Sequence, residues 1–118
     1  MSIAELISQL KNQPNSIEFN DVMAVIEANY DYSPTEFSNG ADNDLVVNAA
    51  GTNEGSCRLF AFAQLNLLDQ AQTLALFGRF YREDVLQNPE GNDHGNIRNF
   101  IKYGWSGIRF QGTALVAK

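Results

Sequence analysis

Residues 57–65 read Cys-Arg-Leu-Phe-Ala-Phe-Ala-Gln-Leu, a segment that is apolar nearly all round. A helix with this pattern is buried on most of its faces, so we expect it at the centre of the core. The polar loop of residues 51–55, bounded by two glycines, precedes the segment and supplies the helix start. We expect Phe60 and Phe62 to be mostly buried.

A second helix-forming pattern follows this segment. Asp69 and Gln72 form a capping box, and apolar residues then recur at spacings of three and four, namely Leu74, Phe77, Tyr81 and Val85. The pattern predicts the longest helix of the protein over residues 70–87, packed on the helix of residues 57–65. We expect Leu74 and Phe77 to be mostly buried.

The C-terminal part of the chain contains a turn, a helix and a short strand. Asp93 follows a Pro-Glu-Gly-Asn turn and is predicted to cap a helix whose apolar residues are Ile97, Phe100 and Ile101. Gly104 is the expected C-terminal cap of this helix. Ile108-Arg109-Phe110 alternates as in a strand, and residues 113–118 are expected to fray.

Two short helices and a pair of strands are predicted before the central segment. Ser2 and Glu5 form a capping box for a first helix, which Pro14 brings to an end. The next helix runs to about Asn29, with one apolar face made of Phe19, Val22, Met23 and Ile26. Residues 35–49 are predicted to form two short strands around a turn or longer loop.

Together these elements predict an α+β fold. We expect one helix-rich domain over residues 1–118, with about five helices and a small antiparallel sheet of two or three short strands. A chain of 118 residues has the usual length of one domain and buries enough surface for one core. The single cysteine excludes a scaffold stapled by internal disulfides. We expect the protein to be a monomer.

The charge of the chain excludes a general nucleic-acid binder. The formal net charge is -6, so phosphate backbones repel the molecule. Residues 1–55 hold nine acids and one base, whereas residues 56–118 hold five acids and seven bases. We interpret the N-terminal excess as a solvated acidic surface, the alternative being a face for a basic protein partner. No apolar stretch is long enough to span a bilayer, and no Sec signal peptide is visible.

Two side chains could carry nucleophilic chemistry. Cys57 is the only thiol and His94 the only imidazole, and each is predicted in the first turn of a helix. A helix N-terminus lowers the pKa of a thiol, so the two could act as nucleophile and base, with Asn48, Asp93 or Asn96 orienting the imidazole. We interpret Cys57 as a small buried hydrophobe and His94 as a surface or capping residue, the alternative being this nucleophile and base.

A polar pocket is the second kind of site that the sequence offers. Two segments supply its candidate binding residues, which are Asn48, Asn53, Glu54 and Asn96. We interpret Trp105 as a core or rim anchor, the alternative being a stacking platform. No cofactor is predicted, because the glycine patterns of nucleotide-binding loops are missing. No metal is predicted, because one His and one Cys supply only two zinc ligands.

Several blocks of sequence occur in a fixed order along the chain: Tyr30-Asp31-Tyr32-Ser33-Pro34-Thr35, Val47-Asn48-Ala49-Ala50-Gly51, Asn53-Glu54-Gly55-Ser56-Cys57, Leu59-Phe60-Ala61-Phe62-Ala63, Asp93-His94-Gly95-Asn96-Ile97-Arg98 and Gly104-Trp105. In these blocks the chain is similar to the HopJ family, from about Leu6 to Gly112. The family is named after a type III effector, a class of proteins that bacteria inject into host cells. The resemblance implies no particular reaction, cofactor or catalytic residue.

Two classes of function follow from these observations. We expect an interaction protein that acts on a host or bacterial protein, marked by an exposed apolar patch beside the acidic N-terminal half. The alternative is a small resident enzyme or ligand-binding protein, marked by convergence of residues 48–57 and 93–96 in one concave site. Glu5 and the low serine content of the N-terminus depart from effector export signals. We therefore expect poor type III secretion and residence in the bacterial cytoplasm.

Overall fold

The computed structural model describes residues 1–118 and contains helices along most of the chain. The α-helices are α1 (Ile3–Asn12), α2 (Phe19–Asn29), α3 (Glu54–Leu65), α4 (Gln70–Ala75) and α5 (Gly95–Tyr103). Short 3-10 helices are η1 (Pro14–Ser16), η2 (Asp42–Asp44) and η4 (Gly104–Gly107), and η3 (Phe80–Val85) is a π-helix. The strands are β1 (Tyr30–Tyr32), β2 (Phe37–Asn39), β3 (Val46–Asn48), β4 (Arg109–Phe110) and β5 (Leu115–Ala117).

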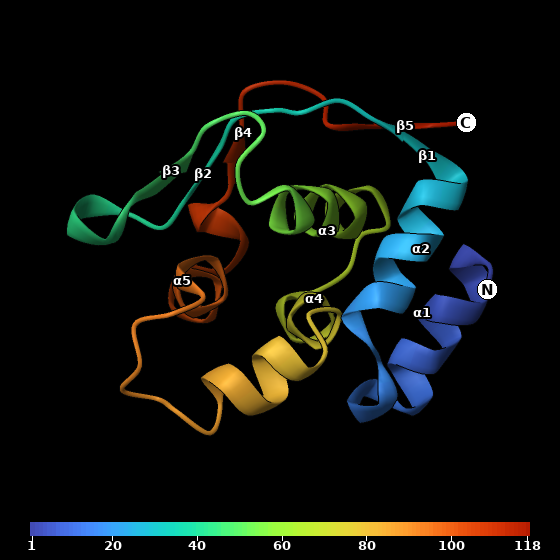
Figure 1. The fold of residues 1–118 in the computed structure, drawn as a ribbon, viewed down its shortest axis with the longest axis horizontal. Helices are drawn as coiled ribbons and strands as arrows, with labels where there is room; N and C mark the ends of the chain where they lie inside the picture. Colours follow the sequence, from blue (N-terminus) through green and yellow to red (C-terminus); the bar gives the residue numbers. More distant parts are fainter.

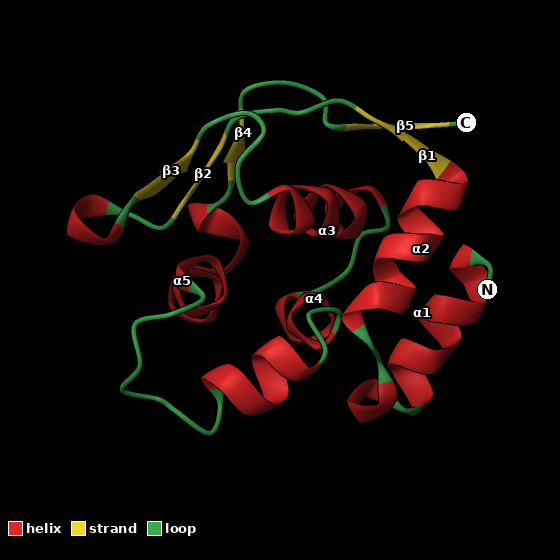
Figure 2. Ribbon diagram, in the orientation of Figure 1, coloured by secondary structure: helices red, strands yellow, loops and turns green.

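The α+β class is confirmed, with the strands along one side of the molecule and the helices making up the rest (Figures 1 and 2). The strands form two small antiparallel sheets rather than one. In the three-stranded sheet, β2 lies between β3 and β4, so Phe37 faces Asn48 on one side and Phe110 on the other. The predicted strand pair within residues 35–49 is present as β2 and β3.

The core is centred on α3, as the sequence predicts. Phe60 and Phe62 of α3 are 0% exposed, and Phe77, in the turn after α4, is 2% exposed. The ring centroid of Phe60 lies 5.5 Å from that of Phe77 and 5.0 Å from that of Phe100. Burial of Leu74 is confirmed as well. Aromatic side chains from several helices therefore meet around one buried helix.

The continuous helix predicted over residues 70–87 is wrong. It ends as α4 at Ala75, and η3 begins only at Phe80, after a turn in which Gly78 has φ +63°. A Cβ at Gly78 would lie 2.9 Å from the backbone nitrogen of Phe19 and 3.0 Å from the carbonyl oxygen of Ile17. The positive φ of Gly78 is incompatible with a continuous right-handed helix, and the close approach of the two backbones leaves no room for a side chain at this position. The longest helix is consequently α3, with 12 residues.

Two further expectations about the C-terminal part are corrected. Asp93 does not cap α5, because His94 occupies the N-cap with φ +50° and the Asp93 carboxylate accepts a hydrogen bond from Arg98 instead. Residues 113–118 do not fray, because β5 pairs with β1 and buries Leu115. The expected cap at Gly104 is confirmed, with φ +62°. None of the helices is both long and apolar enough to cross a membrane.

Candidate functional site

Two helix N-termini with the same unusual geometry lie at the candidate site. Asn53 caps α3 with φ +48° and His94 caps α5 with φ +50°, and neither side chain bonds its own helix. The first bonds within the two helices run from Cys57 N–H to the Asn53 carbonyl and from Ile97 N–H to the His94 carbonyl, each 3.0 Å. The backbone N–H groups of residues 54–56 and 95–96 therefore have no protein acceptor.

These two helix starts form walls of one pocket of about 440 Å³, which we call the α3–α5 pocket. Its polar wall combines residues from the two chain segments, namely Asn53, Gly55, Ser56, His94, Gly95 and Asn96. Its apolar wall includes Phe19 of α2 and Phe80 of η3, whose rings meet edge to face at 5.3 Å. The segments that the sequence singled out as pocket candidates thus converge in one concave site.

The imidazole of His94 is held by a carboxylate that the sequence did not indicate. His94 Nε2 lies 3.0 Å from Asp84 Oδ2, whereas it lies 3.9 Å from Asp93 Oδ2. A carboxylate only accepts hydrogen bonds, so Nε2 carries the proton and, in the neutral ring, Nδ1 is left as an acceptor. The ring also lies 5.2 Å from that of Phe80. Asp84 and Phe80 both belong to η3. π-Helical turns are rare in proteins, and those that occur are often found at functional sites.

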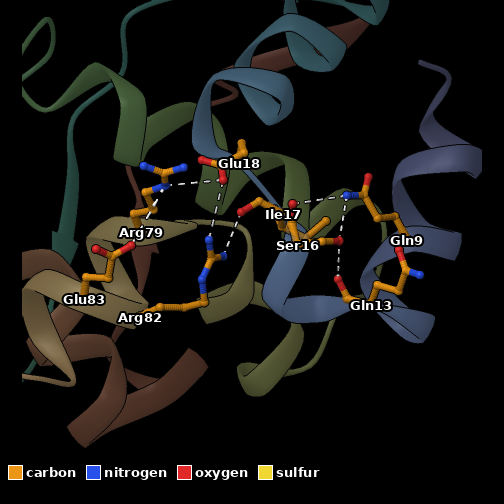
Figure 3. A network of polar contacts seen from close by, with 8 residues as sticks. All are labelled: Gln9, Gln13, Ser16, Ile17, Glu18, Arg79, Arg82 and Glu83. Carbon is orange, nitrogen blue, oxygen red and sulfur yellow. Dashed lines mark hydrogen bonds and ion pairs between the residues drawn. The ribbon is translucent and has the colours of Figure 1, made fainter.

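The π-helix η3 is fastened to the start of α2 by two arginines (Figure 3). The Arg82 guanidinium donates to the carbonyl of Ile17 at 2.7 Å and lies 3.7 Å from the Glu18 carboxylate. Arg79 Nε lies 3.4 Å from the same carboxylate. Phe19 directly follows Glu18 in the chain. These contacts therefore hold Phe19 next to Phe80 in the apolar wall of the pocket.

Four asparagine side chains form a network that includes Asn53 and Asn96 of the polar wall. Asn48 donates to Asn96 Oδ1 at 3.1 Å and accepts from the Asn96 amide at 2.9 Å. Asn53 donates to Asn48 Oδ1 at 2.7 Å, and Asn39 donates to the Asn96 carbonyl at 2.8 Å. The network ties the three-stranded sheet to both helix starts. Asn39, whose Oδ1 is buried without a partner, was not a candidate from the sequence.

The pairing of Cys57 with His94 that the sequence left open is not assembled in this structure. Cys57 is 1% exposed and its Sγ donates to the carbonyl of Thr35 at 3.5 Å, whereas His94 is bonded to Asp84. Cys57 does not line the α3–α5 pocket. Burial raises the pKa of the Cys57 thiol, which disfavours the thiolate.

The other candidates from the sequence do not line the pocket. Glu54 accepts a hydrogen bond from Tyr32 Oη at 3.2 Å, and Asp93 holds Arg98. Trp105 donates from its indole nitrogen to the Leu68 carbonyl at 3.0 Å and packs against core aromatic rings, as a core anchor does. No three His, Cys, Asp or Glu side chains gather closely enough to hold a metal ion.

Comparison with known proteins gives the family of this chain. The family model described as HopJ type III effector protein matches residues 3–115. The chain belongs to the HopJ family. A crystal structure of the unknown-function protein VPA0580 superposes on this HopJ chain with a TM-score of 0.94 at 53% sequence identity, covering 100% of this chain and 95% of that one. No curated protein sequence matches.

Proposed function

We propose that this HopJ protein binds a small organic ligand in the α3–α5 pocket. The observation that carries the proposal is the convergence of Asn53, Gly55, Ser56 and residues 94–97 on one cavity of about 440 Å³. Ligand pockets have volumes of about 300–1,000 Å³ and combine apolar walls with a few polar groups. The α3–α5 pocket has both features.

The lining indicates how a ligand would be held. A planar or apolar body fits against the rings of Phe19 and Phe80, because aromatic faces pack on flat groups. The polar end of the ligand would accept hydrogen bonds from the free N–H groups of residues 95–96 and donate to His94 Nδ1. Asp84 fixes the orientation of the His94 ring, so this acceptor is positioned before a ligand arrives.

Protein interaction, the function that the sequence favoured, is a second candidate. The description of the family as a type III effector supports a protein partner. The specific structural observation in its favour is a groove bordered by the exposed apolar side chains of Leu86 and Ile101. The two functions use different surfaces, so one does not exclude the other.

Gly95 offers a direct test of ligand binding. It lines the pocket, and a Cβ built on it has no atom within 4 Å, so a side chain can begin there and Gly95→Leu should obstruct the pocket. Ala4→Leu on the exposed side of α1 is the matched control. Saturation-transfer NMR with a library of aromatic and heteroaromatic fragments should detect binding to the unmodified protein and to Ala4→Leu, and lose it with Gly95→Leu. Binding that survives in Gly95→Leu, or no binding to the unmodified protein, would contradict the proposal.

A further inference from the structure

A second concave surface lies between the end of η3 and α5, and we call it the η3–α5 groove. Its volume is about 270 Å³, and its lining consists of Val85, Leu86, Pro89, Arg98 and Ile101. Leu86 is 52% exposed and Ile101 is 39% exposed, although both are large aliphatic side chains. The groove shares no lining residue with the α3–α5 pocket. It is therefore a separate surface.

Arg98 gives this groove a fixed shape. Its guanidinium donates to the carbonyl oxygens of Asn88 at 2.9 Å and Asp93 at 2.6 Å, and to Asp93 Oδ1 at 2.6 Å. These bonds hold the loop between η3 and α5, which Figure 1 shows as the long connection leading up to α5. All three guanidinium nitrogens of Arg98 donate to this loop, so the aliphatic part of its side chain is left to line the groove. The groove is preformed.

The charge that stays unpaired beside the groove is negative. Residues 83–93 contain four acids and no Lys or Arg. Three of these acids have a basic partner, because Glu83 lies 3.9 Å from Arg79, Asp84 lies 3.0 Å from His94, and Asp93 lies 2.6 Å from Arg98. The ammonium group of Lys102 is paired with Asp44 at 2.7 Å. Glu90 forms no ion pair, and the chain as a whole carries a net charge of -6. We therefore expect a partner that binds at this surface to carry positively charged side chains.

We propose that the η3–α5 groove docks a short amphipathic helix of a partner protein, with one large apolar side chain in the groove and lysines or arginines beside it. The groove is smaller than the range of about 300 Å³ and above typical of small-molecule sites, so it fits an anchoring side chain rather than a whole ligand. Laying an amphipathic helix into an apolar groove is a common mode of peptide recognition. The acidic surroundings repel anionic lipid surfaces, which favours a protein partner over a membrane.

The test uses a fluorescein-labelled helical peptide of leucine and lysine, with a leucine and glutamate peptide as its twin. Fluorescence anisotropy should show binding of the lysine peptide alone, weakening as salt rises. The double variant Leu86→Ser with Ile101→Ser should weaken binding at least tenfold. Glu90→Gln should weaken it about two- to fivefold, through loss of one charge attraction.

The control is a second double variant, Leu45→Ser with Val47→Ser, which removes two exposed apolar side chains of the β3 region. It should leave the affinity unchanged, and circular dichroism should show that both double variants are folded, because all four side chains are exposed. Three results would overturn the proposal: no binding of the lysine peptide, equal loss in both double variants, or equal affinity for the glutamate peptide. A fourth result would also overturn the proposal: self-association of the protein that is abolished by the Leu86→Ser and Ile101→Ser changes. This result would identify a second copy of the chain as the occupant of the groove.

Discussion

Gly78→Ala tests how the π-helix η3 is placed over the α3–α5 pocket. Gly78 has φ +63°, and a Cβ there would lie 2.9 Å from Phe19 N and 3.0 Å from Ile17 O. Both atoms belong to a backbone, which cannot swing aside as a side chain can. Gly51 is the matched control, because it has φ +86° but no atom within 4 Å of its Cβ position.

The two substitutions differ by one physical effect. An alanine at positive φ costs about 1–2 kcal/mol at either position. The clash at Gly78 adds about 1–3 kcal/mol of overpacking, so Gly78→Ala should lower the free energy of unfolding by about 2–5 kcal/mol. Gly51→Ala should lower it by about 1–2 kcal/mol. Alanine restricts the unfolded chain equally in both variants, so that contribution cancels in the comparison.

Urea unfolding followed by the fluorescence of Trp105 measures the difference. Trp105 is the only tryptophan and packs on Phe60 and Phe100, so its emission reports the core. With an m-value of about 1–3 kcal/mol/M, the Gly78 variant should unfold at a midpoint about 1 M below that of the Gly51 variant. If Gly78→Ala costs no more than Gly51→Ala, the close approach of η3 to residues 17–19 does not constrain the chain and the reasoning is refuted.

Three further predictions concern single groups. Burial raises the pKa of Tyr32 to about 12 from 10.0, so the stability it contributes below pH 10 should be lost as pH rises toward 12, and urea unfolding of Tyr32→Phe should show less of that fall. The buried Cys57 should react only slowly with iodoacetamide at pH 7, with a rate that His94→Ala changes by less than about threefold; rapid alkylation that depends on His94, with unchanged circular dichroism, would restore the thiol mechanism. The first twenty residues fused to a reporter should be exported poorly by a type III secretion system, and efficient translocation that requires the system would refute this.

Much of the helical content was predictable because its signals are local. The capping boxes at Ser2 and Asp69 involve residues three positions apart, and both are present. The all-round apolar pattern of residues 57–65 indicated a buried helix, since no exposed helix tolerates it, and α3 lies at the core. The end of α5 at Gly104 follows from one residue that adopts positive φ at little cost.

The missed elements depend on contacts between distant parts of the chain. The helix over residues 70–87 is interrupted at Gly78, a residue that can end a helix but need not; the sequence around it does not show that the backbone of residues 17–19 lies against this position. Likewise, β5 is ordered because it pairs with β1, more than eighty residues earlier in the chain. The three- and four-residue spacing of apolar side chains predicted one helix, whereas the structure has a turn at Gly78 between α4 and η3.

The candidate site shows the same division. The segments that carry polar groups at helix starts could be identified from the amino-acid order, because glycines, asparagines and the single histidine are visible there. The folded chain was needed to show that Asn53, His94 and Asn96 share a pocket and that Asp84 rather than Asp93 orients the imidazole. It was also needed to show that Cys57 does not line this pocket and bonds the Thr35 carbonyl instead. Helix starts and caps arise from hydrogen bonds within a few residues, whereas a site is assembled by side chains brought together by burial of the core, as in the bond from the Asn39 amide to the Asn96 carbonyl, 57 residues apart.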